Sequence, residues 1–272
     1  MGKWVIGLGA AALAAAAAAS SQVVLAPTVY HSAALPPDSV TSFTVTCPTG
    51  HVAVSAGVST PAPGVTSLSI RPVGVRAFAF RFGNPSTNPK QTVTVAVACR
   101  RIKGTAATLR VLRVKSNSVV VPAEGKKHVV LACPDGTVPA GAGFYLGGRQ
   151  LELRQQTQTL RRFAFTVRNN GKGARSAAFS GTCLTLLRPV SSAPVHLQVK
   201  LVTQTTPVHP GAQVVKRACP AGWVPLATGF NLRPGIKLHG SAAVTGGGRW
   251  AVWNAEDAQA LADLQLACAR VA

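Results

Sequence analysis

The six cysteines are the residues of this sequence whose type and number point most directly to chemistry. A cysteine can act as a nucleophile, a metal ligand or one half of a disulfide. No two cysteines form a CxxC pair, and no histidine lies within metal-ligand spacing of a cysteine. Their number is even, and the apolar N-terminus described below indicates export. We therefore expect disulfides rather than thiols, and no metal site.

The cysteines recur with a regular period, which indicates three copies of one unit. The first cysteine of each copy is Cys47, Cys133 or Cys219, at intervals of 86 residues, and the second follows 52, 50 or 49 residues later. The sequence alone leaves every pairing of the six open. The repeat makes one pairing simpler than the others, and each of its bridges would be worth about 4 kcal/mol in the chain-entropy model. The pairing is Cys47–Cys99, Cys133–Cys183 and Cys219–Cys268.

Each first cysteine opens the same phrase. It reads CPTGHVAVSAGV at 47–58, CPDGTVPAGAGF at 133–144 and CPAGWVPLATGF at 219–230. Proline ends a sheet ladder because it has no N–H donor, and the glycine two residues later permits a turn with positive φ. We expect a strand before the cysteine, a hairpin corner at Pro-x-Gly and a second strand from the valine. The later glycine predicts a bulge or the close approach of another backbone.

A second repeated pattern predicts a half-buried strand in every copy. FAFRFGN at 78–84, FAFTVRN at 163–169 and WAVWN at 250–254 alternate large apolar side chains with others. We expect the aromatic face in the core and the closing asparagine in a turn. The C-terminal segment 255–272 has a helix-forming composition but takes the place of the apolar strand QTVTVAVAC at 91–99. We expect a strand there, because context overrides propensity.

These patterns predict an all-β fold of three homologous, disulfide-stapled units of about 86 residues each. Short linkers near 103–108 and 188–194 and the open edges of small sheets favour compact packing with pseudo-threefold symmetry over beads on a string. The boundaries that we expect are a signal peptide at 1–21 and β repeats at 22–103, 104–190 and 191–272.

The same features carry a resemblance. Cys-Pro-x-Gly, a later glycine, a strand of the form aromatic-x-aliphatic-x-Asn and a closing cysteine resemble the CPxG…C repeats of secreted proteins from high-GC Gram-positive bacteria. The Ala/Val/Arg-rich, Ile-poor composition fits such a source. The resemblance covers the whole mature chain. It implies export and β structure and implies no activity.

The N-terminus has the layout of a secretory signal peptide. Lys3 precedes an unbroken apolar run from Trp4 to Ala19, and small residues follow. The run is slightly short and Ala-rich for a membrane span, and an uncleaved N-terminal anchor is the alternative. We expect a secreted, extracellular protein with no transmembrane span in the mature chain.

The acids, histidines and serines do not form a catalytic pattern. The seven carboxylates are scattered apart from Glu256–Asp257, and no repeat offers a pair for acid–base chemistry. The six histidines do not recur at equivalent positions, and the sequence has no GxSxG, HExxH or GxGxxG motif. We predict a protein that is not an enzyme and has no catalytic residue, no cofactor and no metal.

The charge balance points to anionic partners. The chain has 28 Lys and Arg against seven Asp and Glu, a formal net charge of +21. Such a charge attracts polyanions, although like-charge repulsion that keeps a secreted protein soluble is the alternative. The second repeat is the most basic, and its sheet faces could offer paired donors to phosphates or sulfates. The candidate anion-binding residues are Lys126, Lys127, Arg149, Arg154, Arg161, Arg162 and Arg168.

We therefore predict a secreted binding protein that contacts an anionic polymer or cell-wall surface through basic β-sheet faces. Nucleic acid is a candidate partner through charge alone. One alternative is a structural or adhesive cell-surface protein. Another is a lectin-like or inhibitor protein that stacks ligands on Trp223 and Trp253 and uses variable loops at 60–75, 146–160 and 231–249. No pattern in the sequence indicates an oligomeric state.

Overall fold

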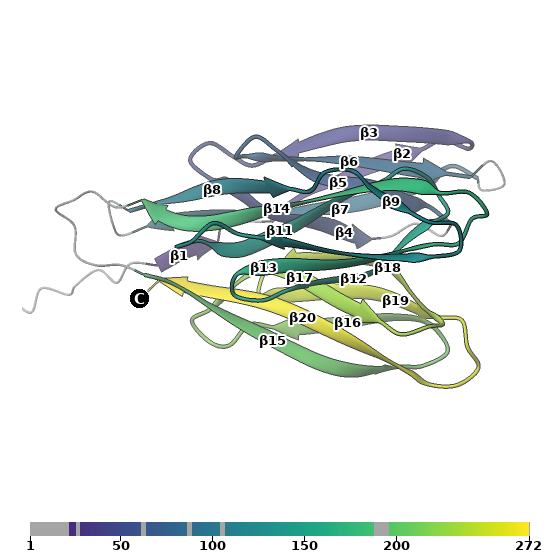
Figure 1. Ribbon diagram of the computed structural model, residues 1–272. Helices are drawn as coiled ribbons and strands as arrows, with labels where there is room; N and C mark the ends of the chain where they lie inside the picture. The colour runs from purple at the N-terminus through teal and green to yellow at the C-terminus, as the bar shows by residue number, and fades with distance from the viewer. Residues whose placement is uncertain are drawn as a thin grey trace, which may run out of the picture.

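A computed structural model gives the fold (Figure 1). It describes residues 22–25, 28–60, 64–85, 89–103, 107–187 and 196–271. The expected signal peptide at 1–21 and most of the two expected linkers lie outside these ranges. Every regular element within them is a β-strand, and every strand pairing is antiparallel, so the all-β expectation is confirmed. The described ranges contain no helix suited to crossing a bilayer.

The strands fall into three groups that follow the repeats. The first group is β1 (Gln22–Leu25), β2 (Val29–Leu35), β3 (Ser39–Thr46), β4 (Val52–Thr60), β5 (Thr66–Val73), β6 (Ala77–Asn84) and β7 (Gln91–Lys103). The second is β8 (Thr108–Lys115), β9 (Val119–Val121), β10 (Lys126–Ala132), β11 (Val138–Leu146), β12 (Leu151–Gln158), β13 (Arg162–Asn169) and β14 (Arg175–Leu187). The third is β15 (Leu197–Val208), β16 (Gly211–Ala218), β17 (Val224–Leu232), β18 (Ile236–Val244), β19 (Gly247–Asn254) and β20 (Ala260–Val271).

Each unit is a sandwich of two sheets. In the first unit, β7 lies between β2 and β4 in one sheet, while β6 lies between β3 and β5 in the other. The second unit repeats this order, with β14 between β8 and β11 and β13 between β10 and β12. In the third, β20 lies between β15 and β17, and β19 lies between β16 and β18. The C-terminal segment is therefore a central strand, as its place in the repeat predicted.

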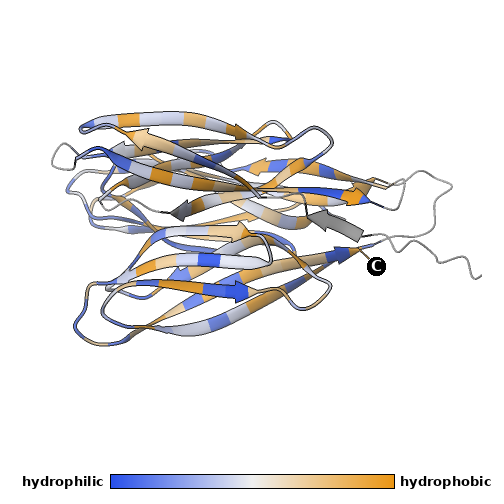
Figure 2. Ribbon diagram, turned by 180° about the vertical axis from the view of Figure 1, so that it is seen from behind, coloured by the Kyte–Doolittle hydropathy of each residue, from blue (hydrophilic) through white to orange (hydrophobic). Residues whose placement is uncertain are grey.

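The core of each sandwich is the aromatic face that the alternation predicted. Phe78, Phe80 and Phe82 on β6 are buried, as are Phe163 and Trp250 at the start of the pattern in the other units. Figure 2 shows hydrophobic and hydrophilic residues alternating along the strands. Alternation places one face of each strand in the core and the other outward, so the repeated pattern by itself fixes which side of each sheet faces its partner.

The three disulfides are those that the repeat favoured. Cys47–Cys99, Cys133–Cys183 and Cys219–Cys268 have Cα–Cα distances of 5.6, 5.8 and 5.8 Å. In each unit, the first cysteine follows an outer strand and the second lies on the central strand of the facing sheet. Each bridge therefore joins the two layers of its own sandwich.

The turn after each first cysteine corrects one expectation. Gly50, Gly136 and Gly222 have the predicted positive φ, at 77°, 72° and 77°. However, β3 pairs with β6 and β4 pairs with β7, so the turn crosses between sheets and is not a hairpin corner. The Cys47 N–H donates to the Arg76 carbonyl at 2.7 Å, and the proline that follows has no N–H. The chain therefore leaves the sheet of β3 and β6 at the cysteine and enters the sheet of β4 and β7.

The asparagine that closes each repeated strand is the turn residue that was expected, and its amide is also a buried clamp. Asn169 Oδ1 accepts the Gly171 N–H at 2.9 Å, and Asn254 Oδ1 accepts the Glu256 N–H at 3.0 Å, as in a turn. Asn169 Nδ2 donates to the carbonyl oxygens of Val121 at 3.2 Å and Gly173 at 2.8 Å. Asn84 and Asn254 make the equivalent bonds in their own units. Each amide thus ties the end of a strand in one sheet to chain segments that lead into and out of the other sheet.

The three units close into a ring with pseudo-threefold symmetry, which confirms the compact arrangement. β5 of the first unit pairs with β11 of the second through Ile70 and Phe144, and β12 pairs with β17 of the third. β18 of the third unit packs beside β4 of the first, which completes the ring. Val54, Ala140 and Leu226 hold the same position in the three phrases and are buried in one apolar cluster on the axis.

One glycine of each phrase makes this contact between units possible. A Cβ atom at Gly143 would lie 2.7 Å from the Ile70 carbonyl oxygen, and one at Gly229 would lie equally close to β12. At Gly57, it would overlap the Ser241 carbonyl oxygen. The close approach of another backbone, one of the two expectations for this glycine, is therefore what the structure contains, and the approaching backbone belongs to the neighbouring unit.

Candidate anion-binding end

The three Cys-Pro-x-Gly turns lie at the same end of the molecule, which is the end beside the C-terminal label in Figure 1. They lead into β4, β11 and β17, which surround the pseudo-threefold axis. We call this the CPxG end. The asparagine clamps lie at the other end, which we call the opposite end. The disulfides therefore hold the sandwiches together at one end, and the asparagine clamps hold them together at the other.

Basic side chains of all three units lie at the CPxG end, although a similar number lies toward the opposite end. Strand register places each of them on a turn of this end or within a few residues of a disulfide cysteine. They are Arg71, Arg76, Arg101, Lys103, Arg110, Arg113, Arg161, Arg162, Lys200, Lys216, Arg217, Arg249 and Arg270. Most are exposed, while Arg76, Arg217 and Arg249 are half-buried. Arg76 Nη2 donates to the Cys47 carbonyl at 2.8 Å and Arg270 Nε donates to Gln198 Oε1 at 2.7 Å, while the exposed groups present hydrogen-bond donors to solvent.

Carboxylates are distributed in the reverse way. Within the described part of the chain, Asp135 is the one acidic side chain at the CPxG end. The other six lie in the half of the molecule toward the opposite end. They are Asp38, Glu124, Glu152, Glu256, Asp257 and Asp263. One ion pair forms among the described residues, between Arg154 and Glu152, and it also lies at the opposite end. The positive charge of the CPxG end therefore has almost no neutralisation within the molecule.

The structure divides the seven basic residues that the sequence singled out. Arg161 and Arg162 lie at the CPxG end, whereas Lys126 and Arg168 pair in register at the other end of β13. Lys126 and Arg168 line a shallow pocket of about 200 Å³ beside Thr166 and Asn231 at the junction of the second and third units. Lys127, next to Lys126, is exposed on the edge strand β10.

Arg154 and Arg149 hold units together. Arg154 Nη1 donates to Glu152 Oε1 at 2.8 Å and to the Ile236 carbonyl at 2.7 Å. Its Nη2 donates to two further carbonyls of the turn between β17 and β18, and 14% of the side chain is exposed. Arg149 Nη2 donates to the Asn84 carbonyl at 3.4 Å across the junction of the first and second units. Arg154 thus has its donors committed to the third unit, and Arg149 has one donor committed to the first.

Arg100 is a basic residue at a unit junction that the sequence patterns did not single out. Its side chain is fully buried, and its Nε and Nη2 donate to the Pro225 carbonyl of the third unit at 3.1 and 2.5 Å. Burial lowers the pKa of Arg100 to about 10. The position after the cysteine is occupied by Leu184 and Ala269 in the other units. Successive side chains of β7 point to opposite faces of its sheet. Cys99 points into the sandwich, so the next residue, Arg100, points out of it toward the axis, and this position in the strand could have indicated its burial.

The two tryptophans considered for ligand stacking lie far apart. Trp223 lies at the CPxG end, where the Arg270 guanidinium sits 4.7 Å from its ring centroid. Trp253 lies at the opposite end, with Lys237 Nζ 5.2 Å from its ring centroid and His239 beside it. The strand β17 runs from one end to the other, a length of roughly 25–30 Å. The two rings therefore do not form a common platform.

The expected variable loops are largely strands. The segments 60–75, 146–160 and 231–249 contain β5, β12 and β18, which form the contacts between units. Their sequences differ because each strand faces a different neighbour. Within the described ranges, His, Cys, Asp and Glu side chains form no group of three or more that could hold a metal ion.

Comparison with known proteins gives little further information. No protein-family model matches the chain, and no curated protein matches it. Among solved structures, the chain is similar to one from an archaeal virus, "The Triple Jelly Roll Fold and Turret Assembly in an Archaeal Virus". The sequence identity is 8%, the alignment covers 91% of this chain and 90% of that chain, and the TM-score is 0.23. A similarity of this size carries no argument about function.

Proposed function

We propose that this protein is a secreted, non-catalytic binding protein whose CPxG end contacts an anionic polymer or cell-wall surface. The observation that carries the proposal is the uneven distribution of carboxylates along the axis. Basic side chains lie at both ends, but those of the CPxG end, which come from all three units, are accompanied by a single described carboxylate, Asp135, whereas the remaining acids lie toward the opposite end. A charge that served solubility alone would have no reason to be segregated in this way.

A polymer is a better match for this end than a single small anion. The basic groups are spread around the ends of three sandwiches and do not converge on one point, so a chain of regularly spaced phosphates or sulfates could engage several at once. Each such contact releases a counterion and adds to affinity. Arg161 and Arg162 belong to this end, so part of the site expected from the sequence is retained in the proposal.

The secreted location belongs to the same proposal. Three disulfides within 272 residues suit an oxidising compartment, where such bonds form and persist. An export signal at the N-terminus would deliver the chain to that compartment. Outside the cell, anionic polymers are abundant on surfaces, and a cationic end would meet them directly.

The proposal is tested by the salt dependence of polyphosphate binding. One triple variant carries Arg161→Gln, Arg162→Gln and Lys216→Gln at the CPxG end. Its matched control carries Lys126→Gln, Arg168→Gln and Lys172→Gln at the opposite end, so both variants have the same net charge. In a plot of log K against log salt concentration, we expect the first variant to lose about two units of slope and the control less than one.

Two outcomes would contradict the proposal. Equal losses in both variants would mean that net charge alone drives binding and that the CPxG end has no special role. Binding of the unaltered protein that does not change with salt would exclude an electrostatic contact altogether. The thermal unfolding midpoint of each variant serves as the control for folding.

A further inference from the structure

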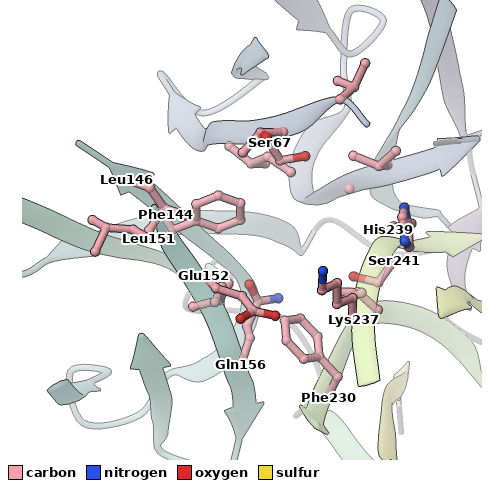
Figure 3. A pocket seen from close by; sticks show the side chains of 18 of the residues that line it. Ser67, Phe144, Leu146, Leu151, Glu152, Gln156, Phe230, Lys237, His239 and Ser241 are labelled. Carbon is pink, nitrogen blue, oxygen red and sulfur yellow. The ribbon is translucent and has the colours of Figure 1, made fainter. Parts of the chain in front are cut away.

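A cavity of about 380 Å³ lies where the three units meet, on the side of the opposite end (Figure 3). It is lined by β4 and β5 of the first unit, β11 and β12 of the second, and β17 and β18 of the third. Gly64, Arg149 and Asn170, which lie in loops of the opposite end, form part of the lining. The cavity is therefore far from the CPxG turns and independent of the polymer-binding proposal.

The cavity exists because the junction between the third and first units has smaller side chains than the other two junctions. The phrase ends in Phe144 and Phe230 in the second and third units but in Val58 in the first, and all three residues line the cavity. The strand that faces Val58 carries Gly240 and Ser241, where a Cβ atom at Gly240 would already lie 2.7 Å from the Val58 carbonyl oxygen. Small side chains at this junction leave space that larger ones fill at the other two.

Much of the lining is apolar and buried. Phe144, Phe230, Leu146, Leu151 and Ile70 are between 2% and 8% exposed. Figure 3 shows Phe144, Leu146 and Leu151 on one side of the cavity. Such a wall favours the hydrocarbon part of a ligand, because burying apolar surface from water is favourable. The volume lies at the lower end of the range of about 300–1,000 Å³ for small-molecule sites.

The charged groups of the lining differ in whether they already have partners. Glu152 accepts from Arg154 Nη1 at 2.8 Å and from Asn170 Nδ2 at 3.3 Å. Lys237, on the other side of the cavity beside His239 and Ser241 in Figure 3, forms no ion pair with any described residue. The Lys237 side chain is exposed to solvent, and among the described residues its ammonium contacts the face of Trp253, 5.2 Å from the ring centroid. A ligand carboxylate in the cavity could therefore pair with Lys237 in place of water.

We propose that this axial cavity binds a small amphipathic carboxylate. Its apolar body lies against Phe144 and Phe230, and its carboxylate pairs with the Lys237 ammonium. A neutral amphiphile of the same length would gain the apolar contact but not the charge-assisted hydrogen bond. A cationic one would bring like charge to Lys237 and Arg149. A polymer of the kind proposed for the CPxG end is too large for the cavity.

Calorimetric titration with decanoate and with decanol tests the proposal on the mature protein. We expect decanoate to bind about tenfold more tightly than decanol. Lys237→Gln should remove that tenfold difference and leave decanol binding unchanged. The matched control is Lys172→Gln, which removes an exposed lysine of the same end that does not line the cavity, and it should change neither ligand.

A second variant tests the cavity itself. Val58→Phe places in the first unit the residue that the other two phrases already have, and it should weaken binding of both ligands by narrowing the space. Ser241→Met, which fills the same junction from β18, is the companion if the Val58 variant folds poorly. The far-ultraviolet circular dichroism and the melting midpoint report on folding.

The proposal is overturned if decanoate does not bind the unaltered protein, if decanol binds as tightly, or if a folded cavity-narrowing variant binds decanoate as tightly as the unaltered protein does. Val58→Phe should not alter the salt dependence of polyphosphate binding, and Lys237→Gln should lower its slope by less than one unit. A failure of the cavity proposal would therefore leave the proposal for the CPxG end untouched, and the reverse also holds.

Discussion

The two ends of each sandwich are held together by different means. At the CPxG end, a disulfide joins the two sheets, and at the opposite end a buried asparagine does so with hydrogen bonds. Both features recur in all three units, whereas the basic side chains and the residues around the cavity differ from unit to unit. The comparison teaches that repeated residues build the fold, while binding is to be sought where the copies diverge.

The largest effect is expected from removing one disulfide. Cys133→Ala with Cys183→Ala frees a loop of 50 residues in the unfolded chain. We expect the free energy of unfolding to fall by about 4 kcal/mol, because the bridge restricts the unfolded state. Urea unfolding measured by circular dichroism checks this. A loss below about 1 kcal/mol would mean that the asparagine clamp and the core are enough to hold the two sheets together. The disulfide end would then contribute less to stability than we expect.

The asparagine clamp should have an intermediate effect. Asn169→Ala leaves the carbonyl of buried Val121 and the carbonyl of exposed Gly173 without their donor. We expect a loss of about 2 kcal/mol of stability, mainly because the unsatisfied Val121 acceptor is buried and retains its desolvation cost. Asn170→Ala is the matched control. The Asn170 side chain is the next one along the chain, is exposed, and donates one hydrogen bond to Glu152 Oε2 at 3.3 Å. It should cost less than about 0.5 kcal/mol. Equal losses in the two variants would contradict the clamp.

Most of the fold could be predicted because each sequence pattern occurs in three copies, so that one copy supports the interpretation of the others. Three spacings of cysteines indicated the disulfides, and alternation indicated the aromatic cores. The hairpin expectation at Pro-x-Gly was wrong because sheet membership depends on distant pairing partners. β3 and β4 are adjacent in sequence, but each finds its neighbour elsewhere in its unit. The hydrogen bonds that the Asn169 amide donates were not predicted for the same reason, since the two carbonyls belong to other parts of the chain.

The candidate site was harder to predict, because nearness in sequence misleads on long strands. Arg162 and Arg168 share a face of one strand, yet six residues of strand separate them by roughly 20 Å and place them at opposite ends. Arg154 looked like a surface cation, but its partners are backbone carbonyls of the third unit, which carry no sequence signal. The CPxG end emerges only when the ends of three units are brought together, which the linear order of charges does not reveal.

The smallest expected effect concerns His239, which sits at the opposite end beside the cavity. Burial, and secondly the positive charge of Lys237, lower its pKa below the ordinary value of 6.5. The unfolded chain therefore binds a proton at this site at a higher pH than the folded one. The stability that neutral His239 contributes is complete above about 6.5 and is lost as the pH falls through the folded pKa.

The Lys237→Gln variant sharpens this point, because it removes the smaller of the two causes and leaves burial in place. The pKa of His239, followed by NMR of its imidazole protons, should rise in the variant yet stay below its ordinary value. Glu152 and Arg149 also line the cavity, and neither changes in this variant. An unchanged pKa would mean that the Lys237 ammonium lies too far from the imidazole to act on it. In that case burial alone would account for the lowered pKa of His239.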